Sequence, residues 1–130
     1  MTKQPSHWSA QGGFALVYMA GVLTVLLLFT GLAVDSGRAY VVKAQLTKAV
    51  DGAALGAARA LNSGNPRAAA AQIFRANFPA GYLGTTSVTD PTTAANFFTS
   101  TADAVSGVNV VTVTADATLP TTFMRLANFT

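Results

Sequence analysis

The stretch GGFALVYMAGVLTVLLLFTGLAVDSGRAYVVKAQLTKAVDGAALGAARAL, residues 12–61, decides the fold of this chain. After the first charged residue its apolar residues still recur every three or four positions, which is the spacing of one helix face. No proline interrupts the stretch, and the first strong helix stop is Asn-Ser-Gly-Asn-Pro at residues 62–66. The spacing predicts one helix over residues 14–61, roughly 70 Å long at about 1.5 Å per residue.

The first half of this stretch, residues 12–34, carries no charged side chain. As a helix it would be roughly 34 Å long, enough to cross the hydrocarbon core of a bilayer. A soluble helix of that length normally has a polar face, and a cleavable signal has an apolar region of only about 7–15 residues. We therefore expect an uncleaved membrane span, with Asp35, Arg38 and Tyr40 at its exit. Asp35 and Arg38 are three apart and are expected to form a solvated surface pair.

The composition favours a membrane or an assembly interface over an enzyme. Apolar residues make up 51% of the 130 residues and charged residues only 10%, against roughly 25% charged in soluble domains. The eight basic residues are not clustered as in nucleic-acid binding. There is no cysteine and a single histidine, His7, which excludes a Ser–His–Asp triad and a His-based metal site. We expect no enzyme activity, metal, cofactor or nucleic-acid partner.

Small residues gather in the second half of the predicted helix. Ala49, Ala53 and Ala57 repeat every four residues, and Gly52 and Gly56 form a Gly-x-x-x-Gly pair on an adjacent line. Small residues at this spacing let another backbone approach closely. The line is a predicted helix-packing interface, and its partner is either the chain's own domain or a neighbouring subunit.

At this point the residues resemble a known family. Gly13 opens the span, Gly-Leu-Ala-Val-Asp-x-Gly-Arg-x-Tyr follows at residues 31–40, and Gln-Leu-x-x-Ala-x-Asp-x-Ala-Ala-Leu at residues 45–55. This combination resembles the N-terminal region of TadE/TadG-like proteins, which are pilin-like components of the tight-adherence (Flp) pilus secretion system. The resemblance is close over about 50 residues.

The resemblance implies a single-pass protein of the bacterial inner membrane, with its N-terminus in the cytoplasm and the bulk of the chain periplasmic, or incorporated in a surface pilus. Its partners would be membrane lipids and other pilin-like subunits, pilus assembly proteins or copies of itself. Counting charges favours the opposite orientation, because Lys3 precedes the span while Arg38, Lys43 and Lys48 follow it.

Processing of the N-terminus is a separate question. Family prepilins are cleaved after a glycine and carry glutamate at the fifth mature position. Cleavage at Gly12 or Gly13 would place Val17 or Tyr18 there. Neither can act as a carboxylate, so the residues argue against processing at these two glycines.

The remainder, residues 62–130, is predicted to form a small α+β domain after an N-terminal tail (1–13) and the long helix (14–61). Asn65-Pro66 starts a second helix that reaches about residue 77. Strands are expected over 85–89, 95–101 and 108–118, with a bulge or late start near Val110 and Val111, and a short amphipathic turn over 121–129. The fold class is α+β and pilin-like: a long helix, a short second helix and a small three-stranded antiparallel sheet.

Two functions are consistent with these observations. The first is a structural or assembly component of a Tad/Flp-type pilus, anchored by one membrane helix that packs against partner helices. The alternative is a membrane-tethered extracytoplasmic binding or adhesion module that uses its threonine-rich sheet. Replacing Gly52 or Gly56 with leucine should abolish assembly of a filament subunit while its domain stays folded, and a tethered binder should tolerate the change.

Overall fold

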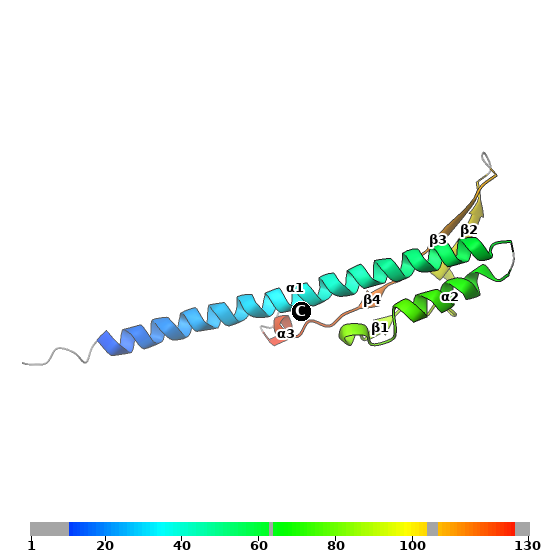
Figure 1. Ribbon diagram of the computed structural model, residues 1–130. Helices are drawn as coiled ribbons and strands as arrows, with labels where there is room; N and C mark the ends of the chain where they lie inside the picture. The colour runs from blue at the N-terminus through cyan, green and yellow to red at the C-terminus, as the bar shows by residue number, and fades with distance from the viewer. Residues whose placement is uncertain (1–10, 63, 104–106, 127–130) are drawn as a thin grey trace, which may run out of the picture. The chain divides into compact units, whose positions relative to one another are not determined.

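The computed structural model describes residues 11–62, 64–103 and 107–126. Its longest element is the helix α1, Gln11–Ala60, which runs without a break (Figure 1) and confirms the single helix predicted from the spacing. The described residues divide into two units. We call residues 11–36 with 121–126 the terminal unit, and residues 37–120 the central unit.

The second helix, α2, spans Pro66–Asn77, as the sequence predicts. The Asn65 side chain accepts a hydrogen bond from the Ala68 N–H at 3.1 Å, and proline occupies the first turn. This arrangement satisfies one of the otherwise unpaired N–H groups of the first turn. At the other end the Phe78 N–H donates to the Phe74 carbonyl, and Pro79 prevents another turn.

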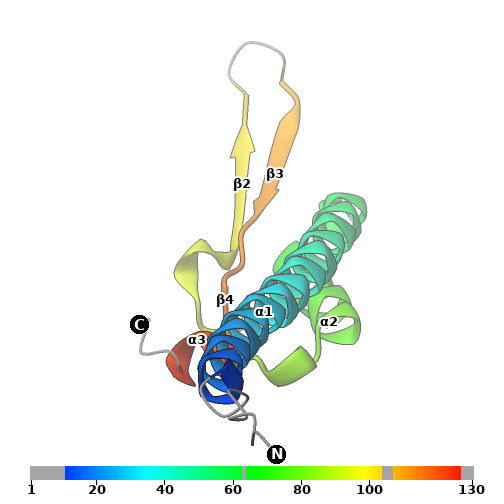
Figure 2. The same ribbon diagram turned by 90° about the vertical axis from the view of Figure 1, so that its left-hand side faces the viewer.

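Short extended segments follow α2. After the 3₁₀ turn η1, Tyr82–Gly84, come the strand β1, Ser87–Val88, a second 3₁₀ turn, η2, Ala95–Phe97, and the strands β2, Phe98–Ala102, β3, Asn109–Val113, and β4, Ala117–Thr118. β2 pairs with β3, and β1 pairs with β4, both antiparallel. Figure 2 shows β2 and β3 side by side as a hairpin. The α+β class with small antiparallel sheets is confirmed.

The predicted single three-stranded sheet is replaced by two two-stranded pairings among the described residues. The third predicted strand, 108–118, divides because it changes partner along its length. The Thr114 N–H donates to the Phe97 carbonyl, whereas the Asp116 N–H donates to the Thr89 hydroxyl. Where the segment leaves β2 and reaches β1, the Thr89 hydroxyl therefore accepts the N–H bond that a backbone carbonyl would accept in a regular sheet.

Two details of the predicted strands are also corrected. The register of β2 with β3 is one-to-one from Phe98↔Val113 to Ala102↔Asn109, so there is no bulge at Val110. Val110 interrupts the alternation of apolar and polar residues because this valine lies on the exposed face of β3. The second predicted strand begins three residues late, since residues 95–97 form η2 and bury the Phe97 side chain in the core.

The core of the central unit is built from aromatic rings and alanines. Phe74, Phe78 and Phe97 are its largest fully buried side chains. The rings of Phe74 and Phe97 meet edge to face with centroids 5.4 Å apart, a favourable aromatic geometry. On α1 the same core contains Ala49, Ala53 and Ala57. Small side chains on α1 leave room for large ones opposite, which is how such a short domain fills its interior.

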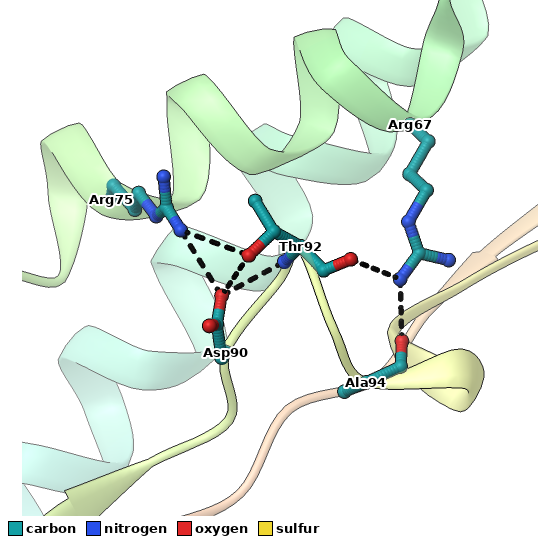
Figure 3. Close-up of polar contacts among 5 residues, drawn as sticks. All are labelled: Arg67, Arg75, Asp90, Thr92 and Ala94. Carbon is teal, nitrogen blue, oxygen red and sulfur yellow. Dashed lines mark hydrogen bonds and ion pairs between the residues drawn. The ribbon is translucent and has the colours of Figure 1, made fainter.

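Two arginines of α2 hold the loop between β1 and η2 (Figure 3). The guanidinium of Arg67 donates to the Ala94 carbonyl at 2.6 Å and the Thr92 carbonyl at 3.4 Å. The guanidinium of Arg75 donates to the Asp90 carboxylate at 3.0 Å and the Thr92 hydroxyl at 3.3 Å. Asp90 also accepts from the Thr92 N–H and hydroxyl, at 2.9 and 2.6 Å. The loop is therefore tied both to itself and to α2.

We expect the stability of this loop to depend on pH below 4. Hydrogen bonds from the Thr92 hydroxyl and N–H, together with Arg75, lower the pKa of Asp90 from 3.8 to about 2. Because the folded-state pKa lies below the unfolded one, the stabilisation is complete above pH 3.8 and is lost as the pH falls towards 2. Acid unfolding of the chain in detergent micelles, compared with Asp90→Asn, should show a pH-dependent difference in this window. Equal pH dependence of the two proteins would contradict the assignment.

Candidate functional site

The N-terminal half of α1 has the composition of a membrane span. Among the described residues it is a helix long and apolar enough to cross a bilayer, and only 6% of its most apolar window is buried. A core helix of a soluble protein would be mostly buried. Its large apolar side chains are instead exposed, including Phe14, Leu16, Leu23, Leu26, Leu27, Leu28 and Phe29.

Polar side chains within this apolar half are satisfied by the helix itself. The Thr24 hydroxyl donates to the Ala20 carbonyl at 2.9 Å, and the Thr30 hydroxyl donates to the Leu26 carbonyl at 2.8 Å. Such bonds to the carbonyl four residues earlier leave no hydroxyl donor to be solvated by water. The two threonines are thus compatible with a lipid environment.

Asp35 ends the uncharged run, and the structure corrects the expectation that it is a solvated surface group. Its side chain is buried, with 4% exposure. Its carboxylate accepts hydrogen bonds from the backbone N–H groups of Thr122, Phe123 and Met124, at 3.1, 2.9 and 3.1 Å. These residues open the short helix α3, Phe123–Leu126, so Asp35 acts as a cap supplied from elsewhere in the chain.

A glycine one turn before Asp35 makes this contact sterically feasible. Gly31 is buried, and a Cβ atom there would lie 2.6 Å from the Phe123 Cβ and 2.8 Å from its Cγ. Any side chain at Gly31 would therefore push Phe123 away. Gly31, Asp35 and α3 form one packed arrangement within the terminal unit, which we call the Asp35 clasp.

The other two predicted exit residues lie in the central unit and differ in environment. The Arg38 guanidinium donates to the Leu83 carbonyl at 2.9 Å, which fixes η1 against α1. Leu83 has a φ of 47°, a left-handed conformation that is uncommon for leucine. The bond from Arg38 helps to hold it there. Tyr40 is exposed, as an interfacial aromatic would be.

The predicted helix-packing residues pack within the same chain. Ala49, Ala53 and Ala57 are fully buried in the core of the central unit, whereas Gly52 and Gly56 face α2. A Cβ atom on Gly56 would lie 2.1 Å from the Ile73 Cδ1 atom, and one on Gly52 would lie 3.4 Å from its Cγ2 atom. The packing partner that the structure provides is thus the chain's own domain, and contact of these residues with another subunit stays a prediction.

The remaining predicted positions are spread along the start of α1. Gly12 and Gly13 are helical, and Gly13 is exposed with nothing near its missing side chain. Whether the chain is cleaved at either glycine stays a prediction. Within the described residues, no group of three or more His, Cys, Asp or Glu side chains could hold a metal ion. The polar contacts found in the terminal unit are structural bonds to backbone groups.

An open pocket of about 290 Å³ lies along α1 between residues 39 and 46. Its lining is mostly apolar, with one basic and one acidic side chain. The lining residues come from α1 and from the segment that includes β4: Ala39, Val42, Lys43, Leu46, Ala115, Asp116, Ala117 and Leu119.

Comparison with known protein families finds a match over the long helix. Residues 12–60 match the Tad family model, which is described as Flp pilus-assembly TadE/G-like. The match coincides with α1 and confirms the family resemblance predicted from the sequence motifs. No curated protein and no solved structure matches the chain. The part of the chain that is similar to this family is therefore the long helix.

The sequence missed the Asp35 clasp because its partners are backbone groups. Thr122, Phe123 and Met124 contribute N–H groups that every residue but proline possesses, so no side-chain pattern marks them. The separation in the chain, 87 residues for the first bond, removes any local signal. The only available signs were an acidic residue directly after an apolar run and a glycine four positions earlier.

We expect Gly56→Leu to destabilise the central unit, in contrast to the expectation from sequence that the domain would stay folded. Leucine would displace Ile73 and separate α2 from α1, lowering the free energy of unfolding by about 1–3 kcal/mol. The matched control is Gly37→Ala, at a helical glycine with no atom within 4 Å, which should raise stability by up to about 1 kcal/mol. Thermal unfolding of the three proteins measures both effects. An unchanged melting temperature for Gly56→Leu would contradict the packing described.

We expect Asp35→Asn to release the first turn of α3. Asparagine has one acceptor oxygen and no charge, so at least one of the three N–H groups loses its partner. Bonds to charged groups contribute about 1.5–3 kcal/mol, so hydrogen exchange at residues 122–124 should accelerate roughly 10- to 150-fold. Exchange at residues 70–74 of α2 is the internal control. Unchanged protection at residues 122–124 would show that the carboxylate does not hold them.

Proposed function

We propose that this protein is a structural or assembly component of a Tad/Flp-type pilus and secretion system, anchored by one membrane helix. The observation that carries the proposal is the family match over residues 12–60, which falls on α1. The match includes both the apolar run and the alanine-rich half, so the motif follows the helix as a whole. Assembly, rather than catalysis, is the role that this family domain supports.

Exposed apolar surface supports the membrane anchor. The leucines between residues 23 and 28 are exposed around α1, and none of the described segments covers them. Contiguous apolar surface of this extent is unfavourable in water because each Å² left exposed costs about 25 cal/mol. A bilayer removes that cost, and the two threonines in the run already bond internally.

The proposed topology places the N-terminus in the cytoplasm and the bulk of the chain in the periplasm, with the N-terminus uncleaved. The family resemblance supports this direction, although the basic residues counted alone favour the reverse. Asp35 hardly changes this charge count, because the orientation of a membrane helix follows its flanking Lys and Arg residues and depends little on acidic ones.

The proposed partners are lipids around residues 12–34 and other pilin-like subunits or copies of this chain along α1. Because Ala49, Ala53 and Ala57 are buried in the core of the central unit, contacts with a neighbouring subunit must use other faces of the helix. Val41 and Leu55 are large apolar residues of α1 that stay exposed in the central unit. They are candidates for such contacts once the subunit joins an assembly.

A membrane-tethered binding module is the second candidate, and the β2–β3 hairpin favours it. Past Phe98 every residue of β2 is exposed, and Val108 and Val110 are exposed on the other arm. An exposed hairpin with valines is suited to contact another molecule. Threonine-to-alanine changes at Thr99, Thr101 and Thr112 would impair a binder and leave pilus assembly intact.

Surface piliation in the native host tests the proposal. Deleting the coding sequence should abolish Flp-type pili, and the wild-type chain should restore them. The variant Leu23→Arg/Leu26→Arg should not, because each arginine at the helix centre costs about 2.5–3.5 kcal/mol on insertion. The matched control, Leu23→Val/Leu26→Val, stays apolar and should restore pili. Electron microscopy of surface pili is the measurement.

Tags at the two ends of the restoring chain report its topology in the same cells. External protease after opening the outer membrane should remove the C-terminal tag only, and mass spectrometry should find an intact N-terminus. Unchanged piliation after deletion would contradict the assembly role. A protected C-terminal tag in the cytoplasm would contradict the whole proposed arrangement.

A further inference from the structure

The short helix α3 lies against the apolar part of α1. Phe123 covers Gly31, which belongs to the uncharged run and precedes Asp35 by one turn. The contact is close enough that a Cβ atom on Gly31 would lie 2.8 Å from the Phe123 ring. The backbone of α3 is thus level with the last turn of the proposed membrane span.

Both α3 and the neighbouring turns of α1 expose large apolar side chains. Phe123 is 44% exposed, although one side of it packs on Gly31. Leu27 and Leu28 precede Gly31 by four and three residues, so they lie one turn away on the same helix face. Leu27, Leu28 and Phe123 are all exposed, and we refer to these three residues as the apolar patch.

The charges near this patch suit the boundary of a bilayer. The Asp35 carboxylate is buried and accepts three N–H groups, so its negative charge does not require water. Arg125, on the same four-residue helix, is exposed and positively charged. Aromatic residues are enriched at membrane interfaces, and a basic residue there is attracted to anionic lipid.

We propose that α3 is an interfacial lipid-binding element. Phe123 lies among the upper acyl chains beside Gly31, Arg125 contacts lipid phosphates, and Asp35 holds the helix in place. The occupant is the bilayer itself because α3 packs on Gly31, which lies within the apolar run that the bilayer would surround. The chain would then contact the membrane twice, at residues 12–34 and at residues 123–125. The proposal rests on the membrane span of the proposed function.

Fluorescence quenching in vesicles tests the proposal on the full chain. Trp8→Phe removes the native tryptophan, and single reporters are placed at Phe123→Trp, at Leu23→Trp within the span and at Leu55→Trp outside it. The vesicles contain phosphatidylcholine and phosphatidylglycerol, with bromine on the acyl chains either near the headgroup or near the chain end. Met124→Trp is a second reporter on α3, in case tryptophan at 123 does not fit over Gly31.

We expect the α3 reporter to be quenched most by bromine near the headgroup and to resist aqueous acrylamide. Leu23→Trp should be quenched by deep bromine, and Leu55→Trp by acrylamide alone. Adding Asp35→Asn should shift the α3 reporter towards acrylamide quenching and red-shift its emission. Adding Arg125→Gln should weaken its lipid quenching in anionic vesicles more than in vesicles of phosphatidylcholine alone.

The reporters separate the two proposals. Lipid quenching of Leu23→Trp with only aqueous quenching of both α3 reporters would overturn the interfacial role of α3 and leave the membrane span standing. Aqueous quenching of Leu23→Trp as well would overturn the span, and the interfacial proposal with it. An α3 reporter that stays in lipid after Asp35→Asn would overturn the holding role of Asp35.

Discussion

The packing of α2 on α1 is the constraint on which the central unit depends. Gly56 and Gly52 lie against Ile73 of α2, and Ala49, Ala53 and Ala57 are buried in the same core as the rings of Phe74 and Phe78. Once α2 is fixed there, its two arginines hold the loop at residues 90–94, and Phe97 completes the core. The hairpin and β1–β4 then follow from where that loop is held.

The same helix serves two environments, and its composition changes where the environment changes. Leucine dominates where no other described segment covers α1, while alanine and glycine dominate where α2 covers it. Large apolar side chains maximise area towards lipid, whereas small ones allow a second backbone to come near. Asp35 lies between these regions, and its charge is satisfied by α3 rather than by solvent. The helix can therefore continue through a buried charge without a break.

The sequence predicted the helices well because their signals are local. The spacing of apolar residues and the lack of proline gave α1, and Asn65 with Pro66 gave the start of α2 to the residue. The strands were harder, because residues 111–118 alternate regularly and yet change partner at residues 114–116. Which strand accepts a given N–H group depends on the loop held by Arg67 and Arg75, and this is a tertiary effect. The partner of the small residues was likewise left open by the sequence, since close packing looks alike within and between chains.

The Asp35 clasp can form only late in the synthesis of the chain. Its carboxylate and the N–H groups that bind it are separated by 87 to 89 residues, so one half of the contact leaves the ribosome long before the other. At about 5–20 residues per second this delay is roughly 4–18 s. During that interval the aspartate must be solvated by water or by another donor. The finished clasp is thus present only in a chain that has been synthesised through residue 124.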